Sequence, residues 1–141
     1  MSVAYAASLK TNRLNLVVNA IGTATGPTIS TTGTAAGTLV IGTSAMATTL
    51  ATFTLDVTPG TVSGSVLTFT NGGTALSGAN FKTATAAASG TAANAQIKNN
   101  AGTVIVDSLT VGTSGTDIII NTTTITSGQT VNWTAGTITH P

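Results

Sequence analysis

From Thr38 to its end, the sequence consists of short β-forming segments that are separated by turn-forming residues. Apolar and polar side chains alternate in several of them, for example from Phe53 to Val57 and from Ser65 to Thr70. Such alternation places one set of side chains on each face of a strand. With about seven to nine segments at spacings of about 8–12 residues, the pattern predicts a mainly β fold, an antiparallel β-sandwich or barrel that is jelly-roll-like.

The residues between the segments favour turns. Asn71-Gly72-Gly73 ends one segment, and Ser127-Gly128-Gln129 precedes the last one. Residues 99–102, with the sequence Asn-Asn-Ala-Gly, join two apolar runs and predict a β-hairpin. We expect Ile118 to Ile120 to form a buried strand, and Trp133, the single tryptophan, to be a core or edge anchor.

The first 22 residues follow a different pattern. Apolar residues recur at helical offsets, at Ala6, Leu9, Leu16, Val17 and Ala20. This spacing predicts one N-terminal amphipathic α-helix over roughly Ala4 to Ile21, which Gly22 ends.

A single domain over residues 1–141 accommodates these elements. It would comprise a helix in 1–22, a loop or arm in 23–37 and the β-sandwich in 38–141. Helical and strand patterns do not alternate after residue 22, so we do not expect a parallel sheet.

The chain is poor in charge. It has 4 Lys and Arg, 3 Asp and no Glu, which gives 5% charged residues and a net charge of +1, and it has 33 Thr. With so few positive charges, the chain has no cluster of basic residues that would bind the phosphates of a nucleic acid. Because nearly neutral surfaces repel each other weakly, this balance favours a subunit of a permanent assembly.

Few residues could carry out chemistry. The chain has no Cys, which excludes thiolate catalysis and Cys-based metal sites. The one histidine, His140, is next to the last residue, where we expect a frayed tail instead of a catalytic triad. The Gly-rich stretches 22–28 and 112–116 lack the Lys of a phosphate-binding loop. We therefore expect no enzyme, no metal and no cofactor.

Two further patterns bear on location. No run approaches the roughly 18 apolar residues of a membrane-spanning helix, so we expect no membrane partner. Lys10 and Arg13 follow the first apolar residues, whereas a secretory signal carries its positive charges before them. We expect synthesis and folding in a cytoplasm.

Three stretches carry a resemblance to a known family. They are YAASLKTNRLNLVVNAIG from Tyr5, LATFTLD from Leu50, and the region 96–131, which matches a pattern R-I-x-x-x-x-G-T-V-V-x-D-G-x-V-G-T-S-G-A-D. The matching residues are Ile97, Gly102, Thr103, Val104, Asp107, Val111, Gly112, Thr113, Ser114, Gly115 and Asp117. The chain resembles small virion proteins of tailed bacteriophages and prophages. It departs from them in 22–37 and 74–95.

The resemblance implies a virion structural protein on the capsid surface, a capsid cement or decoration protein without enzymatic activity. Its partners would be the major capsid protein and further copies of itself, with a trimer as one option. The helix, through Leu9, Arg13, Leu16 and Val17, is the first candidate for subunit contact. The alternatives are a tail or fibre component, a host-surface or glycan-binding β module that uses Trp133, and a Thr-faced ice-binding protein.

Overall fold

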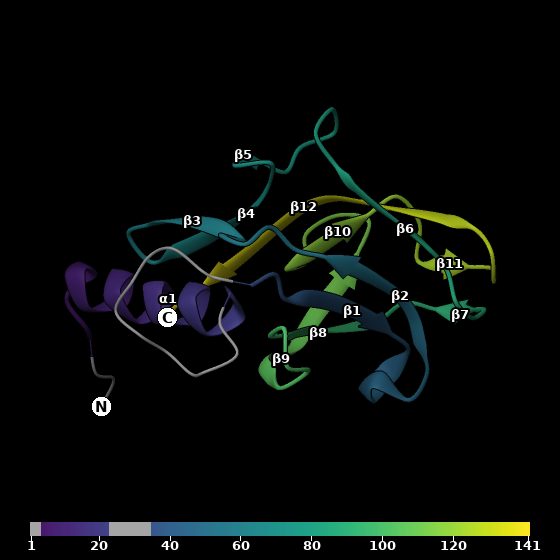
Figure 1. Cartoon of the computed structure of the whole chain (residues 1–141), viewed down its shortest axis with the longest axis horizontal. Coiled ribbons are helices and arrows are strands. Elements are labelled where there is room, and N and C mark those ends of the chain that lie inside the picture. The colour runs from purple at the N-terminus through teal and green to yellow at the C-terminus, as the bar shows by residue number, and fades with distance from the viewer. Residues whose placement is uncertain (1–3, 23–34) are drawn as a thin grey trace.

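The computed structural model describes residues 4–22 and 35–141 of the chain. The fold is mainly β, with 46% strand and 15% helix, and one α-helix precedes a sheet that curls into a half-barrel (Figure 1). This confirms the predicted fold class of a β-sandwich or barrel with one N-terminal helix. Residues 23–34 of the predicted arm lie outside the described residues.

The helix α1 covers Ala7–Gly22, and a short 3₁₀ helix, η1, covers Ser44–Met46. The strands are β1 (Thr38–Gly42), β2 (Thr49–Thr54), β3 (Gly60–Ser63), β4 (Val66–Asn71), β5 (Thr74–Ala75), β6 (Lys82–Thr85), β7 (Gly90–Thr91), β8 (Asn94–Lys98), β9 (Val104–Gly112), β10 (Ile118–Ile120), β11 (Thr124–Ile125) and β12 (Thr130–Thr139).

The main sheet has ten strands. Its path runs β2-β1-β8-β9-β10-β12-β4-β3, while β5 pairs with β4, β6 pairs with β12, and β7 and β11 form a separate two-stranded sheet. The strand pairs are antiparallel, as predicted, except that β9 and β10 are parallel, with Ile118 opposite Val111. The sheet is therefore not a parallel sheet, in keeping with the prediction, but it contains this one parallel pair, which the sequence analysis did not foresee.

The parallel pair depends on a tight loop between β9 and β10. The Asp117 carboxylate accepts hydrogen bonds from the Thr110 backbone N–H (2.9 Å) and the Thr110 hydroxyl (2.7 Å). A Cβ on Gly112 would lie 2.9 Å from the Thr116 Cγ2, so glycine is needed for this close approach. The chain leaves β9, closes the loop on Asp117 and restarts beside the end of β9 in the same direction. Parallel strands usually need a much longer connection.

The predicted turns are present. β8 and β9 form the predicted hairpin, in which the Gly102 N–H donates to the Asn99 carbonyl (3.0 Å). Gly72, Gly73 and Gly128 have positive φ angles, which glycine adopts without steric cost. Turn composition therefore located these chain reversals correctly.

The core is centred on Trp133. Its side chain is 0% exposed, and its ring centroid lies 5.8 Å from that of Phe53 on β2 and 5.3 Å from that of Phe69 on β4. The indole N–H donates to the Ala135 carbonyl (2.8 Å). The prediction that Trp133 is a core anchor is confirmed. The alternative in which Trp133 stacks on sugars is wrong, because no face of its ring reaches the surface.

Helix α1 packs on the β3–β4 end of the sheet and on β9. Its buried apolar side chains are Leu14, Val18, Ala20 and Ile21, of which Leu14, Val18 and Ile21 join the core cluster of the strands. The Thr11 hydroxyl donates to the Gly64 carbonyl (2.7 Å) between β3 and β4. The helix begins at Ala7, later than predicted, and its buried face is rotated away from Leu9 and Leu16.

The C-terminal residues lie against the helix (Figure 1). The His140 backbone N–H donates to the Ser65 carbonyl (2.8 Å), and the imidazole Nε2 lies 3.4 Å from Arg13 Nη1. The Arg13 guanidinium covers the Tyr5 ring at 4.1 Å from its centroid. The expectation of a frayed tail at His140 is therefore wrong.

We predict that Gly136→Ala destabilises the fold by about 2 kcal/mol, because the core has no room for another methyl group. The added Cβ would lie 2.8 Å from Trp133 Cζ2 and 3.1 Å from Phe69 Cδ2. Gly78→Ala is the matched control, since nothing lies within 4 Å of a Cβ there. Urea unfolding of both variants measures the difference, and equal midpoints would contradict the packing argument.

Candidate functional site

The structure separates the four predicted contact residues on α1. Leu9 is 41% exposed and Leu16 is 37% exposed, whereas Val17 packs against the core. Arg13 is half-buried and already contacts Tyr5 and His140. Only the two leucines therefore present apolar surface that a partner could cover.

Tyr5 extends this surface. It is 39% exposed and lies in the non-helical segment just before α1, where its ring contacts Arg13 and His140. Leu16 follows Leu9 by seven residues, which is two helical turns, so both leucines lie along one side of α1. We call Tyr5, Leu9 and Leu16 the helix stripe. The sequence analysis did not name Tyr5 as a contact residue.

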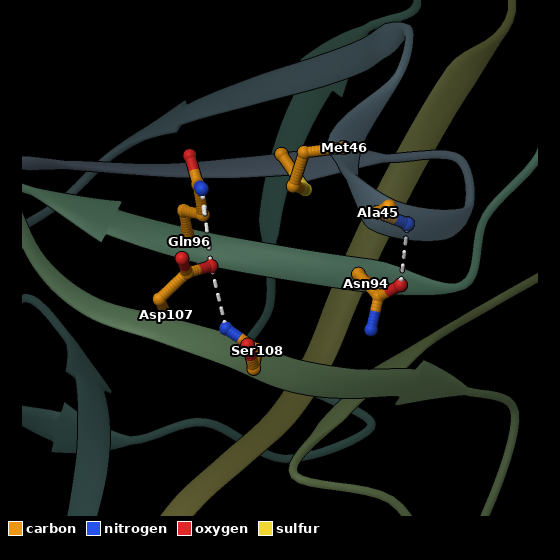
Figure 2. Close-up of a pocket in the computed structure, with 6 residues that line it drawn as sticks. All are labelled: Ala45, Met46, Asn94, Gln96, Asp107 and Ser108. Carbon is orange, nitrogen blue, oxygen red and sulfur yellow. Dashed lines mark hydrogen bonds between the residues drawn. The ribbon is translucent and has the colours of Figure 1, made fainter.

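A second candidate site is a shallow pocket of about 250 Å³ between η1 and strands β8 and β9. It is lined by Ala45, Met46, Asn94, Gln96, Asp107 and Ser108, and we call it the bulge pocket. Figure 2 shows Gln96 and Asp107 close together at one end, Asn94 and Ala45 at the other, and Met46 above them. Sequence analysis did not identify this pocket.

The pocket forms where β9 has an extra residue. Ala95 pairs with Leu109 and Ile97 pairs with Val106, so Gln96 alone lies opposite both Asp107 and Ser108. Two residues opposite one define a β-bulge, which redirects side chains and is common beside functional sites.

Backbone strain is concentrated at this pocket. Ala45, Met46 and Ser108 have φ angles of 54°, 55° and 59°, and among the described residues they are the only non-glycine residues with positive φ. All three line the pocket. Side chains rarely adopt this conformation because the Cβ approaches the following carbonyl oxygen. Such strain is concentrated at functional sites more often than elsewhere.

Hydrogen bonds hold the polar side chains of the pocket in place. Asp107 Oδ1 accepts from Gln96 Nε2 (3.0 Å) and from the Ser108 backbone N–H (2.6 Å). Asn94 Oδ1 accepts from the Ala45 backbone N–H (3.0 Å). The Met46 sulfur lies over β1, 2.9 Å from where a Cβ on Gly42 would be, so Gly42 makes room for it.

A separate polar cluster surrounds Asp56 and Lys82. Their ion pair is 2.7 Å long, with the two side chains 20% and 11% exposed, and it is the one salt bridge found in residues 4–22 and 35–141. Lys82 also donates to Asn71 Oδ1, and Asp56 Oδ2 accepts from the Thr70 hydroxyl and the Gly73 N–H. Every one of these bonds joins neighbouring strands and turns, so the cluster has a structural role.

The described residues contain no group of three or more His or Asp side chains that could hold a metal ion. In the same part of the chain, no helix is long and apolar enough to span a bilayer.

Comparison with known proteins gave no relative: no protein-family model, curated protein or solved structure matches the chain. The resemblance to phage virion proteins therefore depends on the three stretches quoted in the sequence analysis, with the best match in 96–131, and stays an expectation.

We predict that Ser108→Gly stabilises the fold by about 1 kcal/mol, because glycine adopts a positive φ angle without the Cβ clash. Ser63→Gly is the control, since Ser63 is also an exposed strand residue but does not have positive φ. That variant should lose stability through the greater freedom of the unfolded chain. Chemical denaturation measures both, and a destabilised Ser108→Gly would refute the strain argument.

Acid should weaken the Asp56–Lys82 cluster. Burial raises the pKa of the Asp56 carboxyl, but hydrogen bonds from Lys82, the Gly73 N–H and Thr70, with the charge of Lys82, hold it below its ordinary value of 3.8. The unfolded chain then binds more protons at low pH, so stability is present above about pH 4 and is lost as pH falls further.

We therefore predict that Asp56→Asn and Lys82→Met both flatten the dependence of unfolding free energy on pH below about pH 4. Each variant removes one partner of the ion pair, so its stability above pH 4 should also fall. Urea titrations at a series of acidic pH values measure the slope. An unchanged slope in both variants would show that other carboxyls determine it.

Proposed function

We propose that the protein is a virion structural protein of a tailed bacteriophage, a capsid cement or decoration protein that binds the major capsid protein. Support comes from the resemblance in residues 96–131 and from the low charge of the chain, 5% of residues. A nearly neutral surface suits permanent contact with a shell, because little hydrated charge has to be desolvated.

The observation that carries the proposal is the helix stripe. Its three members are 37–41% exposed although each is a large hydrophobic side chain. Stable folding does not require this exposure, because the helix is held by Leu14, Val18 and Ile21 on its other side. In our proposal the stripe covers an apolar patch of the major capsid protein at the outer surface of the shell.

The energetics suit a protein present in many copies. Burying one exposed leucine contributes at most about 1.5–3 kcal/mol, so a stripe of this size binds weakly alone. A symmetric shell repeats the contact at every equivalent position, and self-association would add further contacts between copies. A trimer would match the threefold positions of an icosahedral shell. Stabilisation by binding requires no reaction, in keeping with the expectation of a non-enzyme.

We predict that the double variant Leu9→Lys, Leu16→Lys binds purified heads lacking this protein at least about tenfold more weakly than wild type. Two charges would be buried in an apolar contact without partners. Both side chains are partly exposed in the free protein, so the variant should keep its stability within about 0.5 kcal/mol. Co-sedimentation with heads measures binding, and urea unfolding checks the fold.

The double variant Ser77→Lys, Ala79→Lys is the matched control, because it adds the same two charges at exposed positions of a loop far from α1 along the chain. Heads with bound protein should also resist heat or chelator treatment better than bare heads. Binding to purified tails but not to heads would favour a tail or fibre component. Equal head binding by the double variant and wild type would refute the role of the stripe.

A further inference from the structure

The bulge pocket has polar atoms that remain available after its internal hydrogen bonds are formed. In the described part of the chain, Asn94 Nδ2, Gln96 Oε1, Asp107 Oδ2 and the Ser108 hydroxyl have no hydrogen-bond partner. The other polar atom of Asn94, Gln96 and Asp107 is already engaged, so the orientation of each group is fixed. The pocket is therefore preorganised, which lowers the entropic cost of binding.

The available atoms define the chemistry of a ligand. Asn94 Nδ2 can only donate, Asp107 Oδ2 and Gln96 Oε1 can only accept, and the Ser108 hydroxyl can do both. A hydroxyl group also does both, so a ligand with adjacent hydroxyls can satisfy this mixed set. An anion would be repelled by the Asp107 carboxylate, and an alkylammonium ion would leave the Asn94 donor unused.

The size and shape of the bulge pocket restrict the class of ligand further. The volume of about 250 Å³ is below the roughly 300–1,000 Å³ typical of pockets for drug-sized ligands, so a single small ring fits best. Met46 gives one side of the pocket an apolar, polarisable surface that can cover the C–H face of a ring.

The strained backbone supports a binding role. Ala45 and Met46 take positive φ angles in η1, and this conformation aims the Ala45 N–H at Asn94. The positive φ of Ser108 forms the bulge that brings Asp107 beside Gln96. Glycine would relieve the strain at each position, yet none of the three is glycine.

We propose that the bulge pocket binds one neutral sugar ring through the available atoms of Asn94, Gln96, Asp107 and Ser108. The ligand class is a neutral hexopyranose, either free or as the end of a polysaccharide chain. Without an aromatic ring for stacking, affinity per site is weak, with a Kd on the order of millimolar. This proposal does not depend on the virion role, since the pocket and the helix stripe share no residue.

The test is an NMR titration of isotope-labelled protein with the methyl hexopyranosides of glucose, galactose and mannose. At least one should shift the backbone amides of Ala45, Met46, Gln96 and Ser108 in a saturable manner. Amides near Asp56 and Lys82 are the internal control and should not move. Trisaccharides of the same sugars show whether the ligand is a free sugar or the end of a polysaccharide chain. If the pocket binds a chain end, the trisaccharide should bind with no loss of affinity relative to the methyl hexopyranoside.

Two variants connect the shifts to the pocket. Asp107→Asn preserves the shape and keeps one oxygen for Gln96 and Ser108, but it replaces the available acceptor Oδ2 with an amide donor and loses the charge. It should therefore weaken binding about tenfold, because hydrogen bonds to charged acceptors are the stronger ones. Ser108→Gly loses the hydroxyl and should weaken binding roughly fivefold while the fold becomes more stable. Reduced binding by a more stable protein cannot be attributed to unfolding.

Three outcomes would overturn the proposal. They are the absence of pocket shifts with all three sugars, equal affinity in Asp107→Asn and wild type, and tighter binding of ethylammonium than of any sugar. Head binding by the same preparation is measured separately. A protein that binds heads but no sugar would refute this proposal and leave the virion role intact.

Discussion

The packing of Trp133 between Phe53 and Phe69 holds the curled sheet together. In the order of strands, β2 is at one end of the sheet and β4 is next to the other end, with β12 between them and beside β4. A flat sheet could not bring Phe53 on β2 to the indole on β12. Because the sheet curls, one large ring fills the space between distant strands, and the absence of a side chain at Gly136 lets the ring pack close to its own strand.

The strands and turns of this fold could be predicted from the sequence, whereas one of the strand pairings could not. Alternation along a strand has a period of two residues, so it identified the strands, and Gly and Asn positions identified the turns. Burial of Ile118 and Ile120 was predictable because both belong to an apolar run with nothing polar inside it. The parallel pairing of β10 with β9 was not, since it depends on hydrogen bonds between Asp117 and Thr110 across a loop.

The candidate sites were less predictable than the fold. Helical spacing pointed to Leu9 and Leu16, but it did not say which side of α1 faces the sheet, because apolar residues occur around most of the helix. Leu14 and Val18 form the buried side, and this became evident only from the packing. The bulge pocket left no sequence signal at all. A positive φ angle is normally indicated by Gly or Asn, and Ala45, Met46 and Ser108 are neither.

The three carboxylates show what a chain does with very little charge. Each accepts a backbone N–H: Asp56 from Gly73 in the turn between β4 and β5, Asp117 from Thr110 in β9, and Asp107 from Ser108 at the bulge. Asp56 is also neutralised by Lys82, and the second contact of Asp117 Oδ2 is the Thr110 hydroxyl. Asp117 Oδ1 and Asp107 Oδ2 both have no hydrogen-bond partner among the described residues, but of the two residues only Asp107 lines the bulge pocket. In our proposal, Asp107 is therefore the carboxylate that contacts the sugar, whereas Asp56 and Asp117 hold strands and turns together.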